Sequence, residues 1–306
     1  MAAAQARAAD GAAPAWEQGW YWSGDGLRLH YRDWPAAADV SPGQPVLLCL
    51  PGLTRTAADF EPLAARLAGR WRLVAVDLRG RGESAWAKDS LTYLPLNYLH
   101  DLRLLIESAG IGRFVVIGSS VGGLLTMQLT TGHRAAMAGA ILNDIGPDIE
   151  PAGLARLQAN VGRGGNWPTW VHAARDLATR NAGIYPLWQL ADWLAFAKRL
   201  CRLTQAGRIV FDYDPRIAEP FRLPGRDAGA DLWAALAGLG GLPVLSLRGE
   251  NSDVLTAATQ KRMQARLPEM MVATVPGVGH APTLGEPEAV AAVDTLLEAV
   301  LRGETR

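Results

Sequence analysis

Short, almost wholly apolar runs alternate along the chain with segments in which apolar residues recur every three or four positions. The apolar runs predict strands that are buried on both faces, and the other segments predict helices that cover them. The predicted strands are 45–50, 71–76, 114–117, 138–142, 243–247 and 271–275, and the predicted helices are 57–68, 96–109, 257–266 and 286–301. Residues 16–34 predict an antiparallel hairpin around Ser23-Gly24-Asp25-Gly26. This alternation predicts an α/β fold, with a parallel sheet between layers of helices.

The alternation is interrupted between residues 148 and 232, where helical patterns occur without a strand of comparable strength. Both ends of this interval run directly into predicted sheet segments. We therefore expect a helical cap over 148–232, inserted into a core domain formed by residues 16–147 and 233–306. Residues 1–15, which are rich in alanine, are predicted to be disordered.

Four tryptophans lie in the predicted cap: Trp167, Trp170, Trp188 and Trp193. They are consistent with an apolar or aromatic pocket beneath the cap. They are equally consistent with the hydrophobic core of the cap itself, and the sequence does not separate the two.

Composition restricts the partners of the chain. Its 306 residues include 30 Lys and Arg and 30 Asp and Glu, so the formal net charge is zero, which argues against a nucleic-acid partner. Cys49 and Cys201 fall in strand-like and helical segments, and we expect no disulfide, as in a reducing compartment. Neither a signal peptide nor a membrane-spanning segment is predicted, so we expect a cytoplasmic protein with no membrane partner. The sequence leaves the oligomeric state open.

A strand, a sharp turn and a helix meet at Ser120. The predicted strand 114–117 runs into Gly118-Ser119-Ser120-Val121-Gly122, which matches G-x-S-x-G, and an apolar, helix-compatible run follows. This order of elements is that of a nucleophile elbow, whose strained turn exposes the serine hydroxyl above the sheet. Glycine at positions 118 and 122 leaves room where strand and helix approach each other. We therefore predict that Ser120 is a nucleophile.

A serine nucleophile needs a base within hydrogen-bond reach, and the base needs a carboxylate that orients it. Loops that meet above the elbow follow the carboxyl ends of parallel strands. His280, between Gly279 and Ala281 in the loop after the last strand, is the predicted base. Asp253, in the loop after the penultimate strand, is the predicted acid. Glu250 in the same loop and Asp144 after an earlier strand are the alternatives.

The negative charge that develops during acyl transfer needs two hydrogen-bond donors aimed at one point. One predicted donor is the backbone N–H of Val121, which follows the nucleophile. The other is the backbone N–H of Leu53, in the loop Pro51-Gly52-Leu53-Thr54 after the strand 45–50. Thr54 or Arg55 could also face the substrate, and Arg55 would matter if the substrate carried a carboxylate.

The remaining histidines fit structural positions better than catalytic ones. His30 alternates with apolar neighbours in a strand, His100 has the spacing of a half-buried or solvated helical position, and His133 ends the elbow helix. His172, in the predicted cap, could line a pocket. The run D-L-R-G-R-G-E-S at 77–84 lacks the P-loop pattern, so we expect a tight turn held by its arginines. No Cys/His cluster has metal-site spacing, and we expect neither a metal nor another cofactor.

Five segments together resemble the α/β-hydrolase superfamily, in the branch with a helical cap inserted after the sixth strand. They are P-G-L-T at 51–54, D-L-R-G-R-G-E-S at 77–84, G-S-S-V-G-G at 118–123, R-G-E-N-S-D at 248–253 and G-H-A-P at 279–282. The resemblance implies a mostly parallel eight-stranded sheet and a triad of serine, aspartate and histidine. Pro51 departs from the family pattern, in which a histidine often precedes this glycine and supports the oxyanion loop.

These residues and the resemblance predict a serine hydrolase that cleaves a carboxylic ester through an acyl-enzyme. The expected partner is a small or medium, apolar or aromatic ester. Relatives with the same triad include C–C bond hydrolases, lactonases and perhydrolases, and the sequence does not separate these reactions. A receptor-like protein that binds a ligand without turnover is the alternative of another class. Serine at position 120 argues against dehalogenases and epoxide hydrolases, which have aspartate at the elbow.

Overall fold

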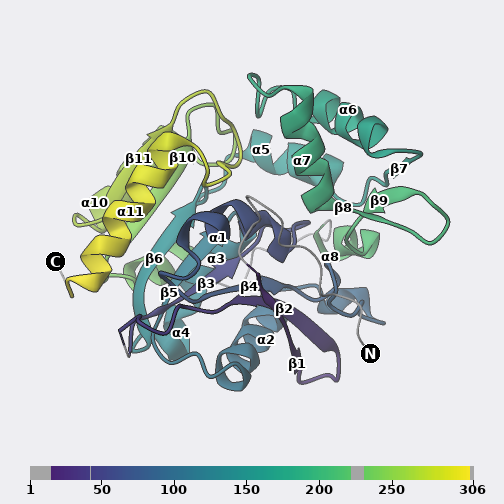
Figure 1. The fold of residues 1–306 in the computed structure, drawn as a ribbon. Coiled ribbons are helices and arrows are strands. Elements are labelled where there is room, and N and C mark those ends of the chain that lie inside the picture. Colours follow the sequence, from purple (N-terminus) through teal and green to yellow (C-terminus); the bar gives the residue numbers. More distant parts are fainter. Residues whose placement is uncertain (1–14, 42, 222–230, 304–306) are drawn as a thin grey trace.

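The central feature of the fold is an eight-stranded sheet with the order β1-β2-β4-β3-β5-β6-β10-β11 (Figure 1). The computed structural model describes residues 15–41, 43–221 and 231–303. Strands β1 and β2 form the predicted hairpin, β2 pairs antiparallel with β4, and the other pairings are parallel. The strands are β1 Glu17–Trp22, β2 Arg28–Trp34, β3 Val46–Leu50, β4 Leu73–Asp77, β5 Phe114–Ser119, β6 Met137–Asn143, β10 Val244–Gly249 and β11 Met271–Val275. The predicted α/β class and eight-stranded sheet are confirmed. Disorder was predicted for residues 1–15, and residues 1–14 lie outside the described residues.

Helices cover both faces of the sheet because each central strand is apolar on both sides. Leu48 and Leu50 of β3 pack into one hydrophobic cluster, and Leu47 and Cys49 pack into the other, as the alternation of side chains along a strand requires. The first cluster is covered by α2 Pro95–Ser108, α3 Val121–Gln128, α9 Leu232–Ala237 and α10 Ala257–Arg266; the second is covered by η1 Ala57–Phe60, α1 Glu61–Leu67 and α11 Pro287–Leu301. The helix predicted over 57–68 is thus a short 3-10 turn followed by an α-helix.

The chain between β6 and α9 forms a separate group of elements, which Figure 1 shows together on one side of the core. Its helical elements are α5 Pro151–Asn160, α6 Trp170–Arg180, α7 Leu190–Leu200, η3 Pro215–Ile217 and α8 Ala218–Phe221. The cap was predicted to be helical, but it also holds a small antiparallel sheet of β7 Asn166–Trp167, β9 Ile209–Phe211 and β8 Cys201–Leu203. Strands of two or three residues are too short to leave an alternating pattern. The boundaries 148 and 232 remain predictions.

Aromatic side chains form the centre of the cap. Trp188 stacks on Tyr185 with ring centroids 3.8 Å apart, and Trp193 meets both rings edge-on. Trp167 packs edge-on against Phe211 of β9 at 5.1 Å. These tryptophans therefore serve the packing of the cap, which was one of the two interpretations of their clustering.

The turn after β4 is held by its arginines, as predicted. Arg79, almost fully buried, donates two 2.7 Å hydrogen bonds to Asp101 of α2 and also pairs with Asp25. Arg81, which is completely buried, donates through Nε to the Leu53 carbonyl at 2.8 Å. The second contact fixes the loop after β3, and that loop belongs to the site described below.

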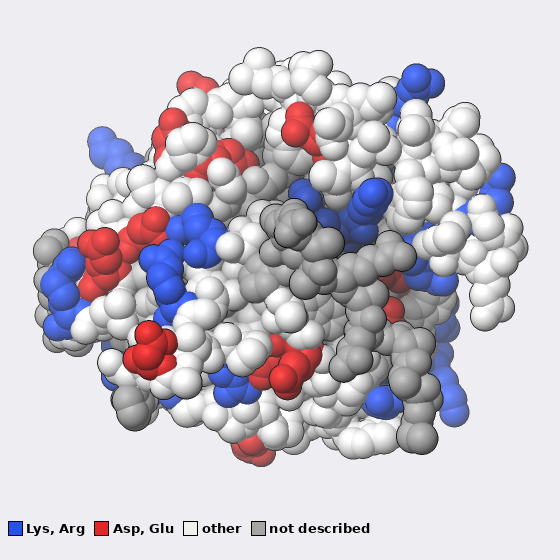
Figure 2. Space-filling model, in the orientation of Figure 1, with Lys and Arg blue, Asp and Glu red and all other residues white. Residues whose placement is uncertain are grey.

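Charged side chains are interspersed over the face seen in Figure 2, where acidic and basic groups lie next to each other. This arrangement agrees with the formal net charge of zero. Among the described residues, no helix has both the length and the apolar character needed to cross a membrane.

Candidate active site

Ser120 occupies a strained turn between β5 and α3. Its backbone has φ 52° and ψ −117°, a conformation that residues other than glycine rarely adopt. The neighbouring glycines permit this turn, since a Cβ on Gly118 would lie 2.4 Å from the Gly122 carbonyl oxygen, and a Cβ on Gly122 would lie 2.1 Å from the Leu50 carbonyl oxygen. The predicted elbow is therefore present, with the serine hydroxyl above the carboxyl end of β5.

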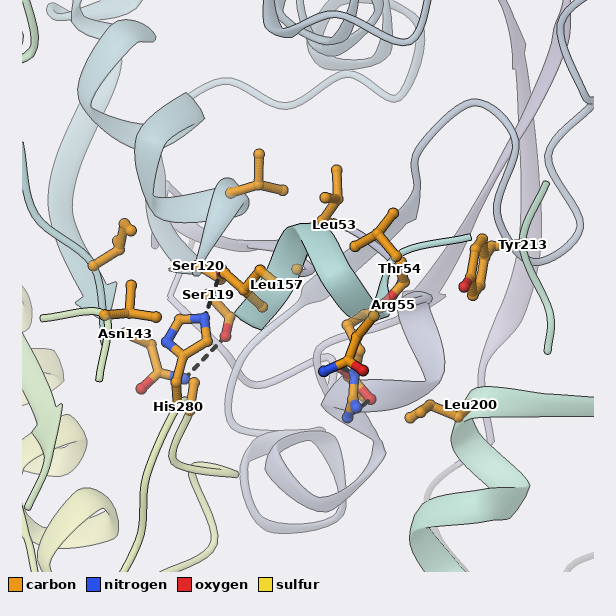
Figure 3. A pocket seen from close by; sticks show the side chains of 18 of the residues that line it. Leu53, Thr54, Arg55, Ser119, Ser120, Asn143, Leu157, Leu200, Tyr213 and His280 are labelled. Atoms are coloured by element: carbon orange, nitrogen blue, oxygen red, sulfur yellow. Dashed lines mark hydrogen bonds and ion pairs between the residues drawn. The ribbon is translucent and has the colours of Figure 1, made fainter. Parts of the chain in front are cut away.

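His280 lies between the serine and a buried carboxylate. Its Nε2 is 2.9 Å from Ser120 Oγ, and its Nδ1 is 2.8 Å from Asp144 Oδ2. A carboxylate can only accept a hydrogen bond, so Nδ1 carries the proton and Nε2 is free to accept the serine proton. Figure 3 shows the Ser120–His280 contact at one side of a cavity.

The carboxylate that orients His280 belongs to Asp144, so the prediction of Asp253 was wrong for this contact. Asp144 follows β6 directly, is fully buried, and also accepts hydrogen bonds from the Gly249 N–H at 2.7 Å and the Ser252 hydroxyl at 2.6 Å. Asp253 instead forms a bidentate ion pair with Arg156 of α5. Burial acts to raise the pKa of the Asp253 carboxyl, but Arg156 and, to a smaller extent, His280 lower it, and the pKa lies below its ordinary value.

Glu250, the other carboxylate weighed for this role, supports the histidine loop from a different position. Its Oε2 accepts a 2.8 Å hydrogen bond from the Gly277 N–H, three residues before His280. The contact spans the loops after β10 and β11. Glu250 can thus stabilise the path of the loop, but it is not the partner of the imidazole.

Both predicted oxyanion donors, Leu53 and Val121, line the same cavity as Ser120. Within the described part of the chain, neither backbone N–H has a hydrogen-bond partner. The Leu53 peptide is held from behind, because its carbonyl accepts the Arg81 contact. The family often has a histidine before Gly52 that supports this loop, and this chain has Pro51 there. In this chain Arg81 supports the loop.

The cavity has a volume of about 350 Å³ and lies between the carboxyl end of the sheet and the cap. Its wall is mostly apolar, with aromatic rings from both core and cap, among them Phe60, Tyr93, Tyr185, Phe196 and Tyr213. None of the four cap tryptophans lines it, so of the two interpretations of their clustering the pocket does not apply to the tryptophans themselves. His172 is exposed and bonds to Thr169 at 2.8 Å, so it does not line the cavity either.

Two residues of the site were not predicted from the sequence. Asn143 donates through Nδ2 to Ser119 Oγ at 3.1 Å and to the Pro282 carbonyl at 2.9 Å, which joins the elbow to the histidine loop (Figure 3). Tyr185 donates to the Ala281 carbonyl at 2.6 Å, which joins the cap to the same loop. A polar residue at the end of an apolar strand was the available signal for Asn143. Nothing in the sequence distinguishes Tyr185 from other cap aromatics.

Within the described ranges, no group of three or more His, Cys, Asp or Glu side chains is arranged to hold a metal ion. The groups that can act chemically are the Ser120 hydroxyl, the His280 imidazole, the Asp144 carboxylate and free backbone N–H groups.

A parallel sheet with a serine elbow, a histidine loop and a buried aspartate at its carboxyl edge defines the class of α/β hydrolases. The chain belongs to the alpha/beta hydrolase family, whose model matches residues 47–293. It is 33% identical over 270 residues to a 3-hydroxybutyrate-oligomer hydrolase of Cupriavidus necator, covering 86% of this chain and 90% of that protein. It is also 28% identical over 264 residues to a pimeloyl-[acyl-carrier protein] methyl ester esterase of Xanthomonas campestris, covering 83% and 94%.

A solved structure supports the same assignment. An alpha/beta hydrolase from Novosphingobium aromaticivorans superposes with a TM-score of 0.86 and 49% sequence identity, covering 92% of this chain and 98% of that one. The chain is therefore a hydrolase by family, and the eight-stranded fold is shared with this relative.

Proposed function

We propose that this protein hydrolyses carboxylic esters through an acyl-enzyme on Ser120. The observation that carries the proposal is the row of contacts from Ser120 Oγ through the His280 imidazole to the buried Asp144, at the wall of a cavity. A serine with such a base attacks a carbonyl carbon, and the alcohol oxygen of an ester departs readily once the same base returns a proton to it.

In the acylation step, Ser120 Oγ attacks the ester carbonyl while His280 Nε2 accepts the hydroxyl proton. Asp144 holds the imidazole in the tautomer with hydrogen on Nδ1 and stabilises its cation. The Leu53 and Val121 N–H groups donate to the negatively charged oxygen of the tetrahedral intermediate, where each donor contributes roughly 10²–10³-fold to the rate. The protonated His280 then gives its proton to the departing alcohol oxygen.

In the deacylation step, a water molecule takes the place of the alcohol. His280 removes a proton from that water, which attacks the acyl-Ser120 carbonyl carbon. Collapse of the second tetrahedral intermediate returns the proton to Ser120 Oγ and releases the carboxylic acid. The base contributes roughly 10²–10⁴-fold in each half-reaction.

The proposed location of the protein is the cytoplasm. The proposed substrate is a small-molecule ester with a mainly apolar body. The cavity supports this substrate, because its apolar wall suits a short acyl chain. The relatives support it as well, since one acts on oligomers of 3-hydroxybutyrate and another on a methyl ester. Oligomers of hydroxy acids are joined by ester bonds, and short oligoesters are therefore the first natural compounds to assay.

The test is hydrolysis of a p-nitrophenyl ester series, acetate through decanoate, by wild type and Ser120→Ala. We expect activity that depends on acyl length and is abolished in Ser120→Ala. Absence of wild-type activity on these esters and on hydroxy-acid oligoesters would overturn the proposal. Activity that persists in Ser120→Ala would overturn the assignment of the nucleophile.

A further inference from the structure

Four arginines line the cavity around Ser120: Arg55, Arg156, Arg180 and Arg199. Three of them are matched by carboxylates. Arg55 pairs with Asp59, Arg156 pairs with Asp253, and Arg180 pairs with Asp176 at 2.8 Å. In the ranges that the structure describes, the guanidinium of Arg199 has neither an ion-pair nor a hydrogen-bond partner.

Arg199 lies at the last turn of α7, where the cap meets the core. Its backbone carbonyl accepts a 3.3 Å hydrogen bond from Thr56 Oγ1, which places this turn against the loop after β3. Figure 3 shows the neighbouring Leu200 and Arg55 on the side of the cavity away from His280. Arg199 lines the same cavity as Ser120, and the hydrogen bond from Thr56 holds its backbone in place.

The charges around Arg199 do not neutralise it. The carboxylates that act on it are Asp59 and Glu61, but Asp59 receives two hydrogen bonds from Arg55, and Glu61 pairs with Arg32 at 2.5 Å. Arg55 adds a second positive charge to the same group. The pKa of the Arg199 guanidinium is lowered, and partial burial contributes more to this shift than the neighbouring charges do. This cation is therefore partly removed from water without receiving an anion in return, which is costly unless a ligand supplies one.

We infer that Arg199 binds a carboxylate of the substrate, at a distance from the scissile ester, and so makes the enzyme selective for anionic esters. This inference rests on the proposed ester hydrolysis and adds the charge of the substrate. A guanidinium binds a carboxylate in a planar, bidentate geometry, and it does so more strongly in an apolar cavity than in water. Oligoesters of hydroxy acids end in a carboxylate and would satisfy this requirement.

Matched ester pairs test the inference. In the first pair, monoethyl glutarate carries a carboxylate on the acyl side, and ethyl pentanoate is its neutral counterpart. In the second pair, 4-acetoxybutyrate carries a carboxylate on the alcohol side, and butyl acetate is its neutral counterpart. In each pair the carboxylate replaces a terminal methyl group. We expect wild type to prefer the anionic member of at least one pair in kcat/KM. We expect Arg199→Gln to reduce that preference by about 10- to 100-fold, mainly through KM, while activity on the neutral member stays near wild type.

Lys198→Gln is the matched control. Lys198 precedes Arg199 on α7, is exposed and does not line the cavity, so its substitution removes the same charge from outside the cavity. The inference would be overturned if Arg199→Gln lost activity equally on both members of each pair, or if wild type showed no preference in either pair. It would also be overturned if Lys198→Gln reduced the preference as much as Arg199→Gln does.

Calorimetry separates this inference from the proposed function. Monoethyl glutarate is titrated into Ser120→Ala and into Ser120→Ala/Arg199→Gln. Binding that is lost with Arg199 supports the anion site even if wild type hydrolyses no ester. Ester hydrolysis without charge selectivity, together with equal or absent binding in both variants, leaves the proposed function standing and removes the anion site.

Discussion

The imidazole Nδ1 of His280 lies 2.8 Å from Asp144 Oδ2, although the two residues are 136 positions apart in the chain. Strand β6 lies next to the nucleophile strand β5, so the residue after β6 emerges beside the elbow. Asp144→Asn keeps the shape of the side chain but removes the charge and favours the wrong histidine tautomer. We expect kcat/KM for ester hydrolysis to fall by about 10⁴-fold.

Asp253→Asn is the control for this prediction, because it removes the carboxylate that the sequence favoured. Asp253 is about one-third exposed and pairs with Arg156, and such a pair contributes ~1 kcal/mol or less to stability. Activity is expected to stay near wild type. A larger loss in Asp253→Asn than in Asp144→Asn, measured on the same ester, would reverse the assignment of the acid.

Several parts of the site could be predicted from the sequence because they depend on local rules. Ser120 follows from a strand, a glycine-flanked turn and a helix in immediate succession, and the structure has that order. His280 follows from the end of the last strand. The triad acid did not follow, because Asp144 and Asp253 both satisfy the chain order serine, aspartate, histidine. Their contacts in the folded chain distinguish them: Asp144 pairs with His280 Nδ1, whereas Asp253 pairs with Arg156 of the cap.

The cap illustrates a second limit. Its helices were visible as patterns, but its three short strands pair only after the chain has folded back on itself. The direction of each aromatic side chain, into the cavity for Phe196 and into the cap for Trp193, depends on that arrangement. Spacing along the chain fixes a helix face, but not the neighbour that the face meets.

Tyr185→Phe tests whether the cap helps to position the histidine loop. The hydroxyl of Tyr185 donates to the carbonyl of Ala281, which follows His280 in the chain. Its removal leaves that carbonyl without this donor, and we expect a loss of about 0.5–1.5 kcal/mol in unfolding free energy. We also expect kcat to fall more than KM changes, as measured by steady-state kinetics.

Tyr21→Phe provides the comparison, since the Tyr21 hydroxyl is buried and has no hydrogen-bond partner among the described residues. Its removal should leave both stability and kcat unchanged or slightly improved. If both variants lose kcat equally, the Tyr185 contact has no specific effect on the loop.

Gly122→Ala tests the steric requirement of the elbow. The new Cβ would lie 2.1 Å from the Leu50 carbonyl oxygen, which belongs to a central strand and cannot move away easily. We expect a loss of about 1–3 kcal/mol in chemical denaturation, accompanied by loss of activity. Gly112→Ala is the control, because its Cβ would meet no atom within 4 Å. A Gly122→Ala protein as stable as Gly112→Ala would contradict the packing described for the turn.

Asp212 is expected to make the stability of the native state depend on pH. Burial is the main cause, and the charge of Asp77 a smaller one, that raises the pKa of the Asp212 carboxyl to about 6, although Arg202 lies 3.2 Å away. Between the unfolded pKa of about 4 and this value, the native state holds a proton that the unfolded state has lost, so the contribution of Asp212 to stability falls as pH rises. The whole effect corresponds to at most about 3 kcal/mol.

Asp212→Asn should therefore gain stability relative to wild type from pH 4 to pH 6, and the gain should level off above pH 6, as followed by urea denaturation at several pH values. The exposed Asp39→Asn serves as control, and a stability difference that is constant across this range would show that Asp212 is not the titrating group.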